Sequence, residues 1–485
     1  MKYIIFNKYK SCFYIFLLVV FFFIIFLRTG IFPISGGDNM WWSESAYWLI
    51  NENSLKWGVL PGDSHNIVSY WPPIIVFFQA LIFKLFGLNQ FTMTFQGTVH
   101  FFLIYLSSFL ILRIKKLEFN QALLGGLFFF LSLNLVGPIL HNRMDSLSYI
   151  FFIFAIIVLL KRSKNENYFV KFFLSGFLVA VSIISYYPLA PIILASFFFY
   201  LFISKIKISE LCLIFSGFLI INFFFGIWIL KDFNIFFLQI FAKENVSLYL
   251  NPLEAVKYFF YAFKIHNLEY LICAILNIVM LVFSKDKLVK TLSFTSFISF
   301  IFLFLGQGGR ATFIIIPSIL SFIIFFDKIV IFNENYIRLR HYFNLLMIFF
   351  IVVKISIITF ISIDQYHSRS YSNAITVLDK YQNIKGKVGI TQFAWLPTRK
   401  LYKFDQLLFM PDYLGSPQVK PHVSEIFFQN NFIDEFDMFV LNENENNLKT
   451  NYPLVYKNIN SDRFKQKDFF EFNGNAFVIY IRKNL

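Results

Sequence analysis

The sequence has little charge and almost no cysteine. Only 15% of its 485 residues are charged, and only three are cysteines. Cys12, Cys212 and Cys273 each lie inside an apolar run, so we expect small packed hydrophobic side chains and neither a disulfide framework nor a thiolate metal site. The chain also has no P-loop, no dinucleotide-binding glycine fingerprint and no HExxH motif, which leaves nucleotide-driven transport and zinc proteolysis without support.

Long apolar segments dominate the sequence instead. Hydrophobic residues make up 58% of the chain and aromatic residues 21%, with 72 phenylalanines. This composition is typical of membrane proteins with several spans. Eleven apolar segments have about the length that a membrane-spanning helix needs. They cover residues 12–27, 93–112, 121–138, 146–160, 169–186, 189–204, 210–230, 267–284, 288–306, 311–327 and 343–363.

Positive charge gathers at every second boundary between these segments. The net charge of +15 therefore reports membrane topology by the positive-inside rule, and we expect no nucleic-acid partner. We predict a multi-pass protein of the cytoplasmic (inner) membrane with its N-terminus inside and its C-terminal region outside. The clusters are Lys2, Lys8 and Lys10; Arg113, Lys115 and Lys116; Lys161, Arg162 and Lys164; Lys205 and Lys207; Lys285, Lys287 and Lys290; Lys328, Arg338 and Arg340.

A long polar stretch, residues 28–92, follows the first apolar segment. A loop of this length between spans is usually functional. After Asp38, aromatic and polar residues recur with helical spacing, which predicts an amphipathic helix lying at the membrane interface. Pro72-Pro73 open a second helix over 74–86, which Gly87 closes. At about 1.5 Å per residue this helix is roughly 20 Å long, too short to cross a bilayer, so it is also expected at the interface.

From Asp364 onward the composition is mixed and largely polar. The patterns predict a helix over 369–382, strands at 387–391, 436–441 and 453–457, and a hairpin over 468–482 around Asn473-Gly474. About 120 residues can bury one small core. The expected fold class is therefore an all-α polytopic membrane domain, residues 1–363, with a small C-terminal α/β extramembrane domain, residues 364–485.

Several short motifs in the first 90 residues occur in a characteristic order: Asp38, Tyr47, Gly58, Tyr70-Trp71-Pro72-Pro73 and Phe86-Gly87. This order resembles the GT-C membrane glycosyltransferases, in particular the bacterial branch related to protein O-mannosyltransferases and aminoarabinose transferases. Those enzymes take a sugar from a polyprenyl phosphate carrier on the outer face of the membrane. The resemblance is strong over residues 12–160, thin to about 330 and nearly empty beyond. Many relatives have Asp-Glu where this chain has Asp38-Asn39.

The resemblance implies that Asp38 is the catalytic base. A carboxylate at the membrane surface could take the proton of an acceptor hydroxyl as that hydroxyl attacks the sugar. By the residues alone, an Asp directly before a helix is more often an N-cap, and a cap does not exclude catalysis.

Other candidate residues lie at the predicted outer ends of the spans. Arg143 and Asp145 form either a structural ion pair or, as the resemblance implies, a site for the donor phosphate and a supporting acid. Arg310 could likewise face a lipid phosphate or only anchor a headgroup. Lys354, inside a span, is a weaker candidate for a donor contact that could pair within the bundle. Tyr47, Glu44, His65 and Tyr70 complete the predicted donor- and substrate-binding set.

A divalent metal near the first loop stays open, because the spacing of Asp38, Glu44, Asp63 and His65 fixes no site. The sequence thus predicts transfer of a sugar from a polyprenyl phosphate donor to an acceptor glycan, lipid or protein on the outer side of the membrane, with inversion. Two alternatives remain at this stage. An O-antigen polymerase or ligase is expected to place its large loop later in the chain, and a lipid or polysaccharide transporter is expected to show two similar halves.

Overall fold

The computed structural model describes most of the helical part of the chain and the core strands of its C-terminal region. The described residues are 2–28, 38–56, 73–132, 139, 143–160, 168–231, 233–234, 236, 268–304, 311–330, 334–364, 372–384, 387–390, 395, 406–408, 436–441, 463–472 and 475–483. They fall into two compact units. The first comprises Met1–Phe26, Gly97–Asp232 and Glu244–Phe360, and the second Leu27–Gln96, Phe233–Lys243 and Ile361–Leu485.

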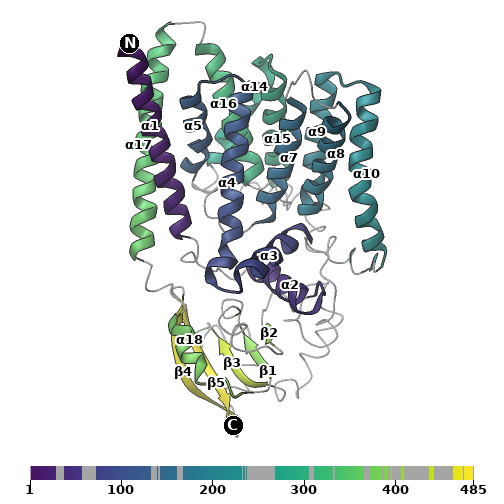
Figure 1. Ribbon diagram of the computed structural model, residues 1–485, viewed down its shortest axis with the longest axis vertical. Helices are drawn as coiled ribbons and strands as arrows, with labels where there is room; N and C mark the ends of the chain where they lie inside the picture. Colours follow the sequence, from purple (N-terminus) through teal and green to yellow (C-terminus); the bar gives the residue numbers. More distant parts are fainter. Residues whose placement is uncertain are drawn as a thin grey trace. The chain divides into compact units, whose positions relative to one another are not determined.

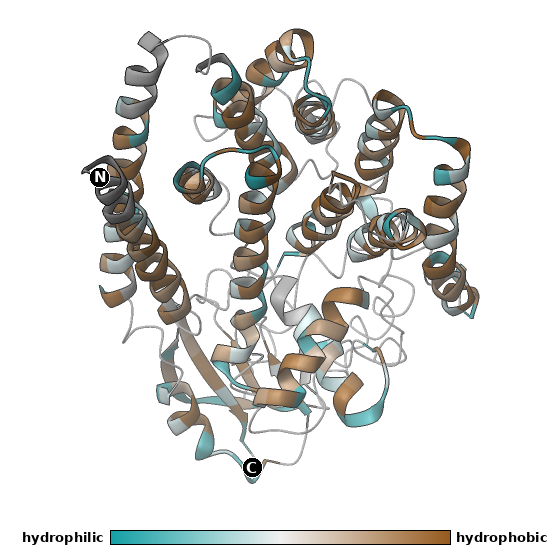
Figure 2. Cartoon of the chain, turned by 45° about the horizontal axis from the view of Figure 1, so that its top comes forward, coloured by the Kyte–Doolittle hydropathy of each residue, from teal (hydrophilic) through white to brown (hydrophobic). Residues whose placement is uncertain are grey.

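The first unit is a bundle of apolar helices that run side by side (Figure 1). Its helices are hydrophobic along most of their length (Figure 2). They are α1 (Lys2–Arg28), α4 (Gln90–Ile114), α5 (Phe119–Leu127), η2 (Phe128–Leu131), α7 (Met144–Leu160), α8 (Tyr168–Ser185), η3 (Tyr187–Leu189), α9 (Ala190–Ser204), α10 (Ile208–Leu230), α14 (Leu268–Phe283), α15 (Lys287–Phe304), α16 (Ala311–Val330) and α17 (Glu334–Asp364).

Each of the eleven predicted spans coincides with one of these helices over its described part. Among the described residues, six segments are long and apolar enough to cross a membrane by length and composition. These are Gln90–Ile114, Tyr168–Ser185, Tyr187–Ser204, Ile208–Leu230, Ala311–Lys328 and Tyr342–Ile361. Long apolar helices that leave phenylalanines exposed, such as Phe223 and Phe224 of α10, are what a lipid environment requires. The chain is therefore a membrane protein with several spans.

Close packing and buried hydroxyl groups hold the bundle together. Helices α8 and α10 approach so closely that a Cβ atom at Gly176 would lie 1.8 Å from the carbonyl oxygen of Ile214. Ser148 of α7 donates to the carbonyl of Ser182 on α8 at 2.8 Å. Asn277 of α14 donates to Ser296 of α15 at 2.7 Å. Small residues and interhelical hydroxyl bonds are the usual means of helix association in membranes.

The second unit contains two short helices from the predicted first loop, α2 (Asp38–Glu52) and α3 (Pro73–Phe86), which pack on each other. Gly87, at φ +77°, ends α3 with its N–H bonded to the carbonyl of Phe83 at 2.8 Å, as predicted. The amphipathic reading of α2 was wrong. Its residues from Trp42 to Ala46 are all buried, so this part of the helix has no exposed face, whereas Ile50, Asn51 and Glu52 at its end are exposed. The placement of α2 and α3 at a membrane interface stays a prediction.

A five-stranded sheet forms the core of the C-terminal region. Its strands are β1 (Lys387–Ile390), β2 (Gln406–Leu408), β3 (Phe436–Leu441), β4 (Phe464–Phe472) and β5 (Asn475–Arg482), in the order β2-β1-β3-β5-β4. β1 is parallel to β2 and β3, whereas β3 and β4 pair antiparallel to β5. Helix α18 (Ser372–Asp379) packs on β4.

The sheet confirms three of the sequence predictions for this region: the strands at 387–391 and 436–441 and the hairpin after residue 468. The predicted helix over 369–382 is found as the shorter α18. The predicted strand at 453–457 lies outside the described residues. Cys273 is buried as expected, but Cys12 and Cys212 are exposed on their helices, so the expectation of packed side chains was wrong for these two.

Candidate active site

The first candidate site lies where α7 begins, in the first unit. Arg143 directly precedes the helix, and Asp145 lies in its first turn. The Nε of Arg143 donates to Oδ1 of Asp145 at 3.1 Å. The Asp145 side chain is only 3% exposed, and that of Arg143 is 26% exposed. The predicted ion pair is therefore present, with a buried carboxylate and a cation that reaches the surface of the unit.

Thr312 of α16 provides a second hydrogen bond to this carboxylate. Its hydroxyl donates to Oδ2 of Asp145 at 3.0 Å, so both carboxylate oxygens are hydrogen-bonded. One turn along α7, the buried Tyr149 packs edge-on against Phe313 with 5.4 Å between ring centroids. Since α7 and α16 are joined at this end by both contacts, the position of Arg143 is fixed by packing as well as by charge. We call Arg143, Asp145 and Thr312 the Arg143 cluster.

Three further titratable residues come close to this cluster. His100 of α4 is fully buried and interacts electrostatically with Asp145. Glu269 and Tyr270 begin α14, and Tyr270 interacts electrostatically with Asp145 and Arg143. None of the three was predicted, although an ionisable residue within or beside an apolar helix is itself a signal of function. Thr312 carried no such signal, because a single threonine in an apolar helix is common.

A second polar site lies in the second unit, around Glu44 of α2. Its side chain is fully buried. Oε1 accepts from the indole Nε1 of Trp48 at 2.5 Å, and Oε2 accepts from the indole Nε1 of Trp395 at 2.5 Å. Tyr47, half-buried, packs edge-on against Trp48. Oε1 is thus bonded within α2, whereas Oε2 fixes α2 to a residue 351 positions away, and Glu44 has a structural role. Its predicted contact with a donor stays a prediction.

Asp38 is the first residue of α2, as expected for a cap or for an acid at the start of this helix. Its side chain lies outside the described part of the structure, as do His65, Tyr70 and Arg310. Arg310 directly precedes α16, the helix that contributes Thr312 to the Arg143 cluster.

Lys354 has an internal partner within the bundle. From the middle of α17, its Nζ donates to the carbonyl oxygen of Ser132 at 2.7 Å, and Ser132 directly follows η2. The ammonium thus satisfies a backbone acceptor at the end of a helix, which agrees with pairing inside the bundle. Its predicted donor contact stays a prediction.

No group of three or more His, Cys, Asp or Glu side chains that could hold a metal ion occurs among the described residues. The four loop residues discussed for a metal are not all described, so the first loop is not tested by this finding.

Comparison with known proteins agrees with the fold. Residues 71–229 match the family model of dolichyl-phosphate-mannose-protein mannosyltransferase. No curated protein sequence matches the chain. Among solved structures, the chain is similar to ArnT from Cupriavidus metallidurans bound to undecaprenyl phosphate, with a TM-score of 0.59 and 10% identity over 98% of both chains.

Two other solved structures share this fold. The arabinofuranosyltransferase AftD from Mycobacteria has a TM-score of 0.55 at 11% identity over 96% of this chain and 40% of AftD. The Archaeoglobus fulgidus oligosaccharyltransferase has a TM-score of 0.50 at 12% identity over 96% of this chain and 73% of that chain. At such low identity these structures establish the fold rather than the substrate. The chain therefore has the fold of these membrane glycosyltransferases.

Proposed function

We propose that the chain transfers a sugar from a polyprenyl phosphate donor to an acceptor glycan, lipid or protein on the outer side of the cytoplasmic membrane. The observation that carries this proposal is the Arg143 cluster. A guanidinium held at the end of a membrane bundle by a buried carboxylate suits the phosphate of a lipid carrier. The bound undecaprenyl phosphate in the similar ArnT structure supports the same class of donor.

In the proposed reaction Asp38 is the general base. The acceptor oxygen forms a bond to the anomeric carbon of the sugar while the bond from that carbon to the phosphate oxygen breaks. The acceptor proton passes to the carboxylate of Asp38, and the electron pair leaves with the polyprenyl phosphate. A single displacement of this kind inverts the anomeric centre.

The other predicted residues take supporting roles in this proposal. Arg143 and Arg310 stabilise the charge of the leaving phosphate, since electrostatic stabilisation of developing charge is commonly the largest catalytic contribution. Asp145 is a positioning residue, because it holds Arg143. Tyr47, His65 and Tyr70 contribute to substrate binding. A metal requirement is left to experiment.

The enzyme test uses the full chain in lipid nanodiscs with a panel of undecaprenyl phosphate sugars, and measures release of undecaprenyl phosphate. Asp38→Asn is the decisive variant, because Asn caps a helix about as well as Asp but is no base. A general base typically contributes about 10²- to 10⁴-fold in rate, so turnover should fall by that factor while the thermal midpoint is unchanged.

The matched control is Asp379→Asn, which removes an exposed carboxylate at the end of α18. It should turn over at the wild-type rate. If the wild type neither binds nor turns over any donor of the panel, the transferase proposal fails. If Asp38→Asn retains full activity, Asp38 is a cap only.

The orientation is part of the proposal. An N-terminus inside and a C-terminal extramembrane domain, residues 364–485, outside follow from the positive-inside rule. Reporter fusions after residue 485 and within the Lys285–Lys287 turn should report opposite sides of the membrane. A C-terminal reporter on the cytoplasmic side would contradict the proposed outer-face reaction.

A further inference from the structure

A basic cavity opens at the end of the bundle opposite the Arg143 cluster. It has a volume of about 1220 Å³ and is bounded by the ends of α4, α7, α9, α14 and α16 and the starts of α10 and α15. Leu159 and Leu160, at the end of α7, line it. Counted along α7 at about 1.5 Å per residue, it lies roughly 21 Å from Asp145. The two sites are therefore separate.

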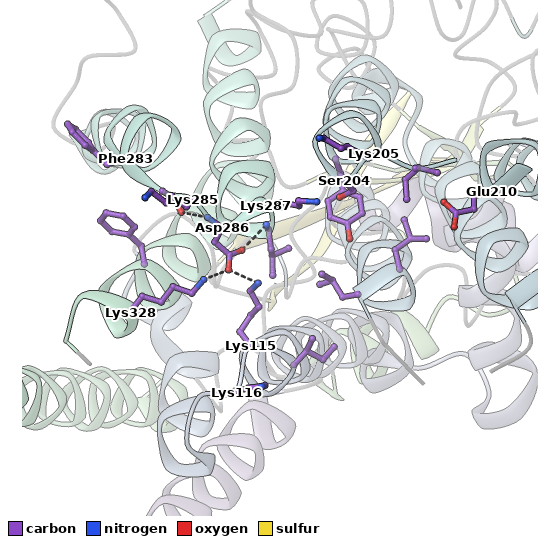
Figure 3. Close-up of a pocket in the computed structure, with 18 of the residues that line it drawn as sticks. Lys115, Lys116, Ser204, Lys205, Glu210, Phe283, Lys285, Asp286, Lys287 and Lys328 are labelled. Atoms are coloured by element: carbon purple, nitrogen blue, oxygen red, sulfur yellow. Dashed lines mark hydrogen bonds and ion pairs between the residues drawn. The ribbon is translucent and has the colours of Figure 1, made fainter. Parts of the chain in front are cut away.

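Seven lysines line this cavity, together with two carboxylates. Figure 3 labels all of them except Lys207. The lysines come from four places in the chain: Lys115 and Lys116, Lys205 and Lys207, Lys285 and Lys287, and Lys328. Four of the six predicted positive-inside clusters thus contribute lysines to one concave surface. Topology alone requires positive charge on this side of the membrane, but it does not require the clusters to share a cavity.

Both carboxylates of the cavity are already engaged in holding the fold. Asp286 binds Lys115 at 2.6 Å and also Lys328, and its Oδ1 accepts from the backbone N–H of Leu288 at 2.9 Å, which caps α15. Glu210 accepts from the backbone N–H of Lys207 at 2.8 Å. Two carboxylates cannot balance the charge of seven lysines.

Five of these lysines have no ion pair with any described residue: Lys116, Lys205, Lys207, Lys285 and Lys287. All five are exposed. Lys116 and Lys205 have positive φ angles of 67° and 54°, at helix ends where glycine is the usual residue. Like charges brought together in this way repel one another unless an anion lies between them.

The rest of the wall is apolar. Ile114, Leu159, Phe283, Leu288 and Phe325 line the same cavity. A ligand that matches both surfaces needs an anionic group for the lysines and hydrocarbon for these side chains. Basic pockets between membrane helices are known to bind the headgroups of anionic phospholipids.

We propose that this cavity is a binding site for an anionic glycerophospholipid, whose phosphate is held by the unpaired lysines and whose first chain carbons contact the apolar wall. The site is distinct from the proposed donor site and does not depend on it. By the positive-inside rule it would take its lipid from the cytoplasmic leaflet.

The test measures lipid binding to the detergent-purified full chain, by native mass spectrometry and by the shift of the thermal midpoint. The probes are phosphatidylglycerol, the zwitterionic phosphatidylcholine and inorganic phosphate. The pocket variant is the triple Lys207→Gln, Lys285→Gln and Lys287→Gln, which leaves both cations of Asp286 in place. The control triple Lys84→Gln, Lys465→Gln and Lys467→Gln removes the same charge from exposed positions elsewhere.

Phosphatidylglycerol is expected to bind the wild type and the control triple with equal affinity. It should bind the pocket triple at least about 10-fold more weakly, because each lysine near an anionic headgroup contributes to the binding free energy. Raising the salt concentration should weaken binding to the wild type. Equal loss in both triples would overturn the proposal, and so would equal binding of phosphatidylcholine. Binding of inorganic phosphate as tight as that of the lipid would show a free-anion site instead.

Discussion

The two ends of the helical bundle each bury one aspartate, and they use it in opposite ways. Asp145 is 3% exposed and Asp286 is 5% exposed. Within the described part of the chain Asp145 forms an ion pair with Arg143, and its second oxygen accepts from a threonine hydroxyl. Asp286 binds two lysines and caps a helix, in a cavity where lysines outnumber acids.

This difference indicates what each end can bind. Asp145 is held by one arginine and one threonine, so the cluster is a fixed structure that presents one guanidinium to a ligand. Around Asp286 the positive charge is in large excess, so the cavity is a surface for anions of less defined geometry. A planar guanidinium gives directional recognition, whereas lysines act as mobile point charges.

The largest effect is expected for Arg143→Gln, which removes the cation that pairs with Asp145. Hydrogen bonds to charged groups contribute about 1.5–3 kcal/mol, so the affinity for undecaprenyl phosphate should fall by about 10- to 100-fold. Equilibrium binding in nanodiscs measures this. The control is Arg113→Gln, which removes an exposed arginine from the last turn of α4. This variant should bind undecaprenyl phosphate as the wild type does. Equal affinity in both variants would show that Arg143 does not bind the donor phosphate.

Glu44→Gln tests a third buried carboxylate, one that has two indole partners instead of a cation. An amide has one acceptor and one donor end, so one of the two indole N–H groups would face an NH₂ group. The loss should be about 1–3 kcal/mol of unfolding free energy, seen as a lower thermal midpoint together with a shift of tryptophan emission. Glu52→Gln, which removes a carboxylate that is 47% exposed from its pair with Lys56, should lower the midpoint less.

Asp286 makes the stability of the folded protein depend on pH. Burial would raise the pKa of this carboxyl, but the hydrogen bonds from Lys115 and Lys328 outweigh burial and lower it. A depressed folded-state pKa stabilises the protein above the unfolded value of about 4, and this stability is lost as the pH falls through the folded pKa. Asp286→Asn should therefore lower the thermal midpoint at pH 7 and leave a shallower decline below pH 4. An unchanged acid limb would contradict the assignment.

The smallest effect is expected for the surface pair of Lys380 and Asp468. The two groups are 2.9 Å apart, but the lysine side chain is 58% exposed. Solvent screening reduces such a pair to less than about 1 kcal/mol, so Lys380→Gln should shift the thermal midpoint barely at all. A large shift would mean that the stability contributed by an ion pair depends on its distance and not on its burial.

The sequence predicted the helices well, because apolar length in a membrane protein is set by the thickness of the bilayer. It also predicted that Arg143 and Asp145 could pair, since they are two residues apart at a membrane boundary. It could not predict Thr312, which comes from a helix 167 residues later, or Trp395, which binds Glu44 across 351 residues. Such contacts depend on tertiary packing and leave no local pattern.

The arrangement of the lysine clusters also could not be predicted from local sequence. The four clusters that line the cavity were recognised in the sequence and lie at the ends of apolar helices. Their convergence on one cavity follows only from the arrangement of α4, α9, α14 and α16. The amphipathic prediction for α2 failed for a related reason, since the burial of Trp42 and Glu44 is set by residues distant in sequence.

The most direct test of the proposed donor site is to find which end of the bundle binds the donor phosphate. The wild-type chain in nanodiscs containing phosphatidylglycerol would be cross-linked to an undecaprenyl phosphate that carries a photoreactive group beside its phosphate. Mass spectrometry would then locate the labelled peptides. The account predicts labels at the start of α7 and α16, around Arg143 and Thr312, and their loss in Arg143→Gln. Labels confined to the lysine cavity would contradict it.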